Sequence, residues 1–142
     1  MSNAAANKAI LERAYKSWDQ SKGKALEELI AVFSEDVQFG SLAEGAEPAV
    51  FTKLAVGKAA MRGYFDGLLA SWSMNDYKIT DMIAEGDRVV AIGSTCWTCK
   101  HTDKTINTPK VDVWTFRDGK AVAFYEYFDT AGMLKAMTKD AP

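Results

Sequence analysis

Apolar side chains recur at helical spacing in the first half of the chain and alternate with polar ones in the second half. The first such set ends before a polar stretch at residues 21–23 and comprises Ile10, Leu11, Ala14, Tyr15 and Trp18. The same spacing returns in two later stretches, and this periodicity is typical of helices with one buried face. We therefore expect three helices, over residues 3–20, 24–33 and 57–72.

Strands and turns are expected in most of the remaining chain. A short strand is predicted at 37–40, and a small, acidic loop around Pro48 separates it from the third helix, with a strand fragment at 49–53. After Trp72, period-two alternation interrupted by glycine turns predicts a meander, followed by a last helix capped by Asp129. These elements span residues 77–83, 88–100, 105–116, 121–128 and 130–137. No repeat or linker divides the chain, so we expect one α+β domain over residues 1–142.

Composition narrows the class of protein. The 142 residues are 48% hydrophobic and 25% charged, which suits one globular core, and the net charge is −2. Without clusters of Lys and Arg, the chain lacks the attraction that drives binding to nucleic acids or anionic membranes, so we expect neither partner. The N-terminus contains no basic stretch followed by an apolar run, and we expect a cytoplasmic protein.

The two cysteines, Cys96 and Cys99, form a Cys-x-x-Cys pattern. A zinc site needs about four ligands, but the chain offers one histidine, His101, and no second cysteine pair. A redox pair needs a helix N-terminus to lower the thiol pKa, whereas this segment is predicted to be a strand, in which positions three apart face opposite sides. We expect two reduced thiols, no disulfide and no bound metal, and we interpret His101 as a solvated turn residue.

Three parts of the chain resemble a known superfamily. Residues 26–39 read Leu-Glu-Glu-Leu-Ile-Ala-Val-Phe-Ser-Glu-Asp-Val-Gln-Phe, and residues 57–62 read Gly-Lys-Ala-Ala-Met-Arg. Near the end, residues 113–120 read Val-Trp-Thr-Phe-Arg-Asp-Gly-Lys and residues 125–133 read Tyr-Glu-Tyr-Phe-Asp-Thr-Ala-Gly-Met. With the order of predicted elements, these segments resemble the SnoaL-like branch of the nuclear transport factor 2 superfamily. The resemblance implies a cone, in which a curved antiparallel or mixed sheet is wrapped by three helices around an apolar pocket.

Active sites of this superfamily can be placed on the sequence position by position. The ketosteroid isomerases combine a first-helix tyrosine, a base carboxylate and a protonated aspartic acid. These three positions fall on Ala14, Ser41 and Asp112, so that only the last one is matched. The resemblance to this group of enzymes is therefore partial.

Two other branches complete the comparison. The limonene epoxide hydrolases use an Asp, Arg, Asp trio, of which the last falls on Glu126 and the others on Gly93 and Thr95. The SnoaL-type polyketide cyclases place one acid/base carboxylate on the penultimate strand, at or near Asp112. The resemblance thus implies a cofactor-free isomerase or cyclase with Asp112 as the catalytic acid/base, assisted by Glu126.

The closing hairpin decides whether these two carboxylates share the pocket. If residues 117–119 form a three-residue loop, Asp112 lies opposite Phe124 and Lys110 lies opposite Glu126. A two-residue Asp-Gly turn would instead pair even-numbered residues of one strand with odd-numbered residues of the other, so that Asp112 and Glu126 would face opposite sides of the sheet. We favour the longer loop because it keeps both carboxylates that the resemblance implies, Asp112 and Glu126, inward together with all even-numbered positions. The inward set is then Lys110, Asp112, Trp114, Phe124, Glu126 and Phe128.

Two interpretations of this face remain open. In the first, which we favour, aromatic neighbours desolvate Asp112, so that its raised pKa suits it to removing a proton next to a carbonyl, and it is not paired with Lys110. In the second, Lys110 and Glu126 form a cross-strand ion pair, and Asp112 satisfies a buried polar group. Further residues expected to contact a ligand, although they also suit the core, are Tyr15, Trp18, Phe39, Trp72 and Trp97.

The sequence therefore favours a protein that binds a small apolar carbonyl compound, either as an isomerase or cyclase or as a non-catalytic binding module. A third alternative is a dimerisation module. The outward stripe of the last two strands is apolar enough to predict a homodimer interface. This stripe comprises Val111, Val113, Tyr125 and Tyr127.

Overall fold

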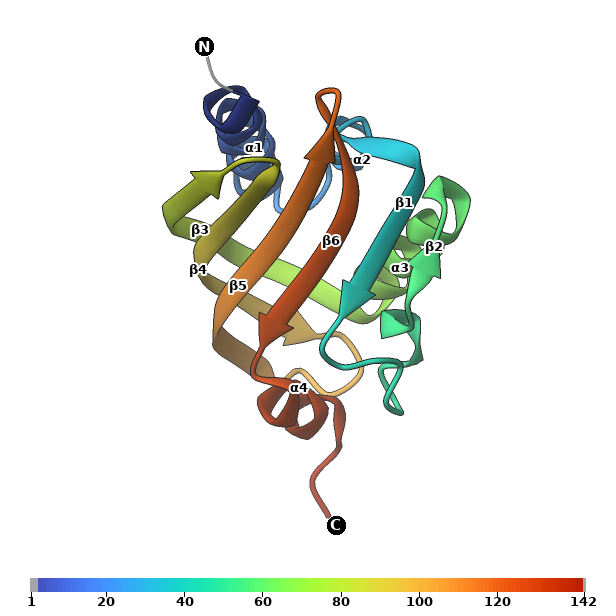
Figure 1. The fold of residues 1–142 in the computed structure, drawn as a ribbon. Coiled ribbons are helices and arrows are strands. Elements are labelled where there is room, and N and C mark those ends of the chain that lie inside the picture. Colours follow the sequence, from blue (N-terminus) through green and yellow to red (C-terminus); the bar gives the residue numbers. More distant parts are fainter. Residues whose placement is uncertain (1–2, 142) are drawn as a thin grey trace.

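The computed structural model describes residues 3–141 (Figure 1). The helices are α1 (Asn3–Gln20), α2 (Leu26–Ile30), α3 (Lys58–Ser71) and α4 (Thr130–Met137), with a short 3-10 helix at Val50–Thr52. The strands are β1 (Phe33–Ser41), β2 (Ala55–Val56), β3 (Trp72–Glu85), β4 (Arg88–Cys99), β5 (Thr105–Arg117) and β6 (Lys120–Phe128). None of the helices in this part of the chain is long and apolar enough to span a membrane.

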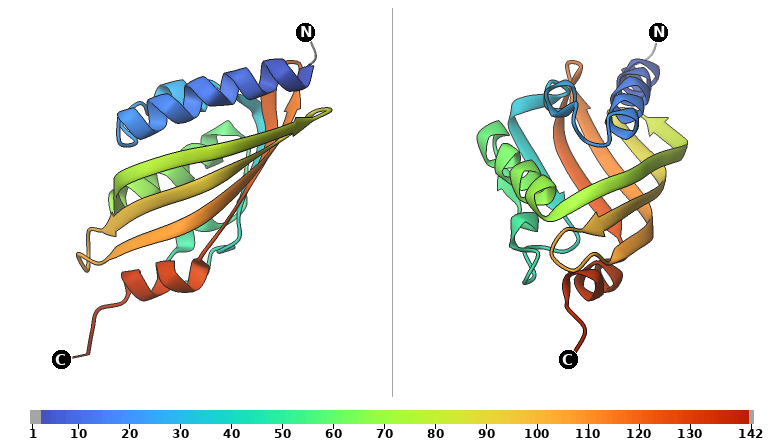
Figure 2. Two further views of the ribbon diagram at one scale, coloured as in Figure 1. Left: turned by 90° about the vertical axis from the view of Figure 1, so that its left-hand side faces the viewer. Right: turned by 180° about the vertical axis from the view of Figure 1, so that it is seen from behind.

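The strands form one six-stranded sheet in the order β2-β1-β6-β5-β4-β3. β1 runs parallel to β6, and every other neighbouring pair is antiparallel, so the sheet is mixed. The sheet curves, with α1 and α3 against its concave side and α4 at the end opposite α1 (Figure 2). This arrangement confirms the predicted α+β fold, a curved mixed sheet wrapped by helices.

Irregular pairing bends the sheet. The register between β3 and β4 shifts twice, the second time immediately after Ile79, and such bulges increase the local twist and bend a strand. Gly93 pairs with Ile79 at this point, where a Cβ atom would lie 1.9 Å from the carbonyl oxygen of Lys78. A glycine is therefore required for β3 and β4 to approach this closely.

The core lies between the concave face of the sheet and the helices. The buried face of α1 includes four residues of the predicted stripe, Leu11, Ala14, Tyr15 and Trp18, whereas Ile10 is half-buried. The buried residues of α3 are Met61, Tyr64 and Phe65. From Ile106 to Phe116, the even-numbered residues of β5 are buried, whereas their odd-numbered neighbours are exposed or half-buried. The predicted inward direction of this strand is therefore correct.

Two predicted elements near the N-terminal half are wrong in extent or type. The helix expected over 24–33 ends at Ile30, and Phe33 begins β1, because β1 pairs with β6 and the amide of Ala121 donates to the carbonyl of Val32. Sheet pairing across the fold thus overrides the local helical spacing. The strand fragment expected at 49–53 is instead the 3-10 helix at Val50–Thr52.

The predicted register of the closing hairpin is also wrong. Arg117 pairs with Lys120 across a two-residue turn, in which Asp118 and Gly119 both have positive φ. The ladder then shifts between Thr115 and Phe116, leaving Val122 as one extra residue on β6. This bulge restores the parity that the short turn would otherwise break. The even-numbered residues remain inward, but their partners differ from those expected.

Candidate active site

A buried lysine lies between two buried carboxylates on the concave face. Asp112 pairs directly with Glu126 across β5 and β6, not with Phe124, and Lys110 pairs with Phe128. The Lys110 Nζ lies 2.5 Å from Asp112 Oδ1 and 3.1 Å from Glu126 Oε1. The exposed fractions of these residues are 7% for Lys110, 1% for Asp112 and 6% for Glu126. The ammonium therefore bridges both carboxylates away from bulk water.

Local geometry explains how these three groups meet. Lys110 and Asp112 are two positions apart on one strand, so both side chains emerge on the same face. Glu126 is the residue opposite Asp112 on the neighbouring strand, where side chains of a cross-strand pair lie close together. The bulge at Val122 sets this pairing. The carboxylate pair is thus a product of the hairpin register.

Two tyrosines donate to the same oxygen of Asp112. The hydroxyl of Tyr15, from α1, lies 2.6 Å from Asp112 Oδ2, and that of Tyr77, from β3, lies 2.8 Å away. Trp114 Nε1–H donates to the Tyr15 hydroxyl at 2.8 Å. The two tyrosine rings stack, with centroids 5.7 Å apart. The Tyr15 hydroxyl therefore has two hydrogen-bond partners, Asp112 and Trp114, whereas the Tyr77 hydroxyl bonds to Asp112 alone among the described residues.

Glu126 is held in a similar way. Its Oε2 accepts from the hydroxyl of Tyr64, on α3, at 2.6 Å and from that of Ser41, at the end of β1, at 2.8 Å. Both hydroxyl groups are buried. Each oxygen of the two carboxylates therefore has at least one hydrogen-bond donor.

Charges and burial shift the protonation of these groups. Burial alone would lower the pKa of the Lys110 ammonium, but the charges of Asp112 and Glu126 outweigh it and raise that pKa well above its ordinary value. Burial, reinforced by the neighbouring carboxylates, raises the pKa of Tyr15, Tyr64 and Tyr77 well above 10.0. Lys110 is therefore a cation, and the tyrosines remain neutral hydrogen-bond donors, throughout the physiological pH range.

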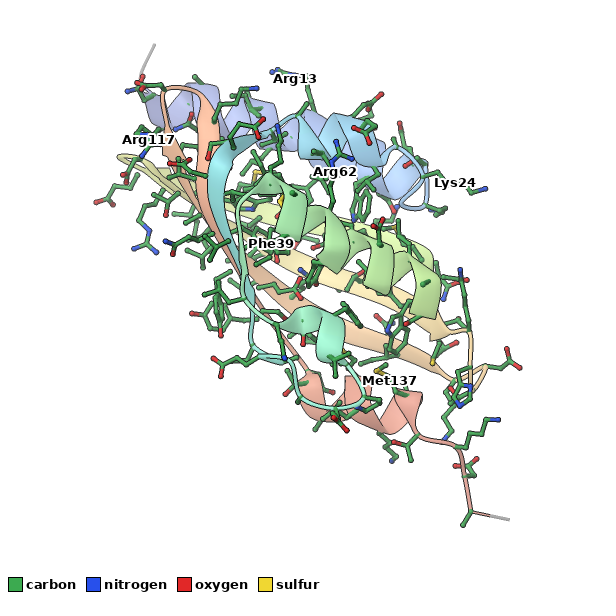
Figure 3. All side chains as sticks on the ribbon, turned by 90° about the vertical axis from the view of Figure 1, so that its right-hand side faces the viewer. Arg13, Lys24, Phe39, Arg62, Arg117 and Met137 are labelled. Atoms are coloured by element: carbon green, nitrogen blue, oxygen red, sulfur yellow. The ribbon has the colours of Figure 1, made fainter. Side chains whose placement is uncertain are left out.

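An apolar cavity of about 90 Å³ lies beside this cluster. Phe39 lies between β1 and α3 (Figure 3), with its ring centroid 4.7 Å from that of Tyr64. Phe51, Leu68 and Phe128 are half-buried lining residues, so movement of these side chains would enlarge the space. All the residues proposed from the sequence for catalysis or ligand contact line this cavity: Tyr15, Trp18, Phe39, Trp72, Trp97, Lys110, Asp112, Trp114, Phe124, Glu126 and Phe128.

The structure corrects one interpretation and adds three residues. Asp112 faces the cavity as expected, but it is a direct partner of Lys110, contrary to the interpretation we favoured from the sequence. Tyr64, Tyr77 and Ser41 were not recognised as site residues. The helical spacing of Tyr64 and the strand position of Tyr77 predicted burial, but neither pattern indicates which carboxylate a hydroxyl meets.

Within residues 3–141, no three or more His, Cys, Asp or Glu side chains are arranged to hold a metal ion. Cys96 and Cys99 are free thiols on β4, and only Cys99 is buried. Their burial follows the alternation of the strand, in which odd-numbered positions face the core from Val89 onwards, apart from Gly93. The two cysteines therefore belong to opposite faces, as the predicted strand requires.

The curved sheet, its helices and an aromatic cavity with a buried acidic centre define a protein of the nuclear transport factor 2-like class. The chain belongs to the SnoaL-like domain family, whose model matches residues 11–124. No curated protein matches the sequence.

Solved structures share the fold at low sequence identity. A nuclear transport factor 2-like protein of Burkholderia pseudomallei is 22% identical, with a TM-score of 0.79, and the match covers 94% of this chain and 98% of that one. TerC, co-crystallised with polyporic acid, is 21% identical, with a TM-score of 0.78 and coverages of 93% and 98%. A protein of Catenulispora acidiphila with a ketosteroid isomerase-like fold, in complex with trimethylamine, is 17% identical, with a TM-score of 0.74 and coverages of 94% and 97%.

Proposed function

We propose that this protein is a cofactor-free isomerase that moves a proton within a small carbonyl compound, with Asp112 as the acid/base. The observation that carries the proposal is the Asp112 carboxylate, which faces an aromatic cavity beside a buried ammonium and two neutral tyrosine hydroxyls. A base, a cation and hydroxyl donors in a water-poor site are the groups that enolate formation requires.

Tyr77 is the donor best able to turn from Asp112 to a substrate. Asp112 Oδ2 accepts two hydroxyl groups, so it keeps one hydrogen bond when the other is withdrawn. Tyr15 is fixed by the indole of Trp114, whereas Tyr77 is not held by a second hydroxyl partner among the described residues. We infer that the Tyr77 hydroxyl moves to the substrate carbonyl oxygen and frees a lone pair on Asp112.

The proton transfer then proceeds in two balanced steps. Asp112 takes a proton from the carbon next to the carbonyl, the C–H electron pair forms a C=C bond, and the carbonyl π pair moves to oxygen. The nearby Lys110 charge and the Tyr77 hydroxyl stabilise this oxygen. Asp112 then returns the proton to a different carbon of the conjugated enolate, which restores the carbonyl. Glu126 assists by holding Lys110 at its other side.

Conversion of cyclohex-3-en-1-one into cyclohex-2-en-1-one tests this proposal, because the product is conjugated and its ultraviolet absorbance differs. We expect Asp112→Asn to lower kcat by at least about 100-fold, the usual contribution of a general base. Tyr77→Phe should reduce kcat more than Tyr15→Phe. Asp36→Asn, which removes an exposed carboxylate that pairs with Arg117, is the matched control and should leave the rate unchanged.

A folded Asp112→Asn variant with the wild-type rate would exclude Asp112 as the base. A wild-type protein that binds the ketones without converting them would exclude the isomerase. Hydrogen–deuterium exchange at the carbon next to the carbonyl, followed by NMR, checks for enolate formation without net isomerisation. If exchange occurs and depends on Asp112 while no isomer forms, the enolate forms but the proton is not returned to the other carbon.

A non-catalytic binding module is the second candidate. It is favoured by the hydrogen bonds already made to every carboxylate oxygen. Two carboxyl groups beside a single ammonium would suit a small amine such as the trimethylamine bound by the Catenulispora acidiphila protein. Binding of trimethylammonium without turnover of the ketones would support this candidate. In either case, we propose a cytoplasmic homodimer.

A further inference from the structure

One buried hydrogen-bond donor in the cavity wall has no acceptor. Trp72, the first residue of β3, has an exposed fraction of 3% and lines the cavity. Its indole nitrogen is the one buried side-chain nitrogen or oxygen without a hydrogen-bond partner in the described part of the chain. Such groups are rare in folded proteins, so an unpaired donor in a cavity wall indicates a missing acceptor.

The other two tryptophans that line the cavity from the sheet differ in this respect. Trp97 donates its indole N–H to the hydroxyl of Thr95 at 2.6 Å, and Trp114 donates to the hydroxyl of Tyr15 at 2.8 Å. These two indole groups therefore have acceptors within the fold. The unpaired donor of Trp72 is an exception that the scaffold does not explain.

Trp72 takes no part in the hydrogen bonds of the carboxylate cluster. Along β4, Gly93 pairs with Lys110, and Cys99 pairs with Trp72, so the two partners are six residues apart on that strand. The cavity therefore offers a charged acid/base centre and, away from it, a lone neutral donor.

We propose that Trp72 forms a second recognition point, and that the ligand carries a hydrogen-bond acceptor, such as a carbonyl or ether oxygen, remote from its reacting carbonyl. The inference rests on the proposed function, because that function places the reacting carbonyl at Asp112 and Lys110. The ligand class is then a bifunctional compound, with an apolar middle against the aromatic walls and an oxygen at each end.

Matched pairs of linear ketones test this inference. Hexan-2-one and octan-2-one carry one carbonyl, whereas hexane-2,5-dione and octane-2,7-dione add a second acceptor at two different spans. We expect at least one dione to bind roughly two- to tenfold more tightly than its monoketone, the usual contribution of one neutral hydrogen bond. Trp72→Phe should abolish this advantage, so that each dione binds no more tightly than its monoketone to the same variant.

Trp97→Phe is the matched control, because its indole N–H already has an acceptor, and it should preserve the advantage of the dione. In wild-type protein, the indole N–H signal of Trp72 in a ¹H–¹⁵N NMR spectrum should move downfield with the dione but not with the monoketone. This second measurement decides the question if Trp72→Phe does not fold.

The outcomes separate the two proposals. If the monoketones bind but neither dione gains affinity nor moves the Trp72 signal, the second recognition point is wrong and the proposed function stands. If Trp97→Phe removes the advantage and Trp72→Phe does not, the donor is misassigned and the inference fails. If none of the ketones binds, both proposals fall.

Discussion

Replacing Lys110 by methionine is the sharpest perturbation of the buried cluster. The substitution keeps a long apolar stem but removes the ammonium that lies 2.5 Å from Asp112 and 3.1 Å from Glu126. Two carboxylates then face each other across β5 and β6, with hydroxyl donors but no positive charge between them. Removing one partner of a buried ion pair typically costs about 3–5 kcal/mol, because the remaining charges stay desolvated.

We therefore expect Lys110→Met to lower the free energy of unfolding by about 3–5 kcal/mol at pH 7.5. For a chain of this length, that corresponds to a fall in Tm of roughly 10–20 °C. The pKa of Lys110 is higher in the folded protein than its value of 10.5 in the unfolded chain. The stability that the ammonium contributes is therefore fully present below pH 10.5 and is lost only as the pH rises through the folded-state pKa. The wild-type contribution is thus constant between pH 5 and pH 7.5.

The variant should behave differently with pH. Without the ammonium, the folded chain takes up a proton on its carboxylate pair more readily than the unfolded chain does. Stability then decreases as the pH rises, so the gap to wild type should be smaller at pH 5 than at pH 7.5. Thermal melts at both pH values, followed by circular dichroism, measure this gap.

Lys78→Met is the matched control for this experiment. Lys78 lies 2.7 Å from Asp19, but its side chain is 58% exposed, and removal of such a pair should change stability by less than about 1 kcal/mol. Adding Glu126→Gln to Lys110→Met removes one of the opposed charges and should recover part of the loss. A Lys110→Met variant as stable as wild type at pH 7.5 would refute the reasoning, since the cluster could not then hold two ionised carboxylates.

Three further outcomes are expected. Burial raises the pKa values of Tyr15, Tyr64 and Tyr77, so these side chains should ionise only as the protein unfolds. The free energy of unfolding should therefore fall as the pH rises above 10.0. Ultraviolet difference spectra that show tyrosine ionisation in the folded protein would contradict this. Cys96 and Cys99 should both react with a thiol reagent after denaturation without a reductant, and metal analysis should find no stoichiometric zinc. Light scattering should show a homodimer that Tyr125→Glu dissociates. Tyr125 and Tyr127, the latter 45% exposed, form an apolar patch with ring centroids 5.0 Å apart. An oligomer that Tyr125→Glu leaves intact would place the interface elsewhere.

The fold was largely predictable because local signals and sheet pairing agree over most of the chain. Helical spacing around Tyr15 and Trp18 located α1, and turn residues located the ends of the long strands, except the start of β3, which was expected at residue 77 and lies at Trp72. The prediction was wrong at Phe33, where an apolar residue continues the helical spacing but is needed by a strand that pairs with β6, far along the sequence. Contacts of this range leave no mark on local periodicity.

The site was predictable in membership but not in connectivity. Alternation along β5 placed Lys110 and Asp112 on one face, whereas Glu126 was placed there through a longer loop that the structure does not have; the bulge at Val122 keeps it inward instead. Aromatic residues with buried spacing supplied the walls. The partner of each polar group depends on the hairpin register and on the approach of Tyr64 and Tyr77 from other elements. The Lys110–Asp112 ion pair was disfavoured because aromatic neighbours were expected to desolvate Asp112, although the two residues share one face of one strand.

The bulge at Val122 has a consequence for how this chain tolerates changes of length. Val122 is unpaired, so its deletion would leave Phe116–Ala121 and Thr115–Ala123 as consecutive pairs, and Asp112 would still lie opposite Glu126. An in-frame loss of this one codon would thus keep the acidic centre and remove only the local bend that a bulge produces. Homologues that lack the bulged residue but keep the two-residue turn are therefore expected to keep the same inward face.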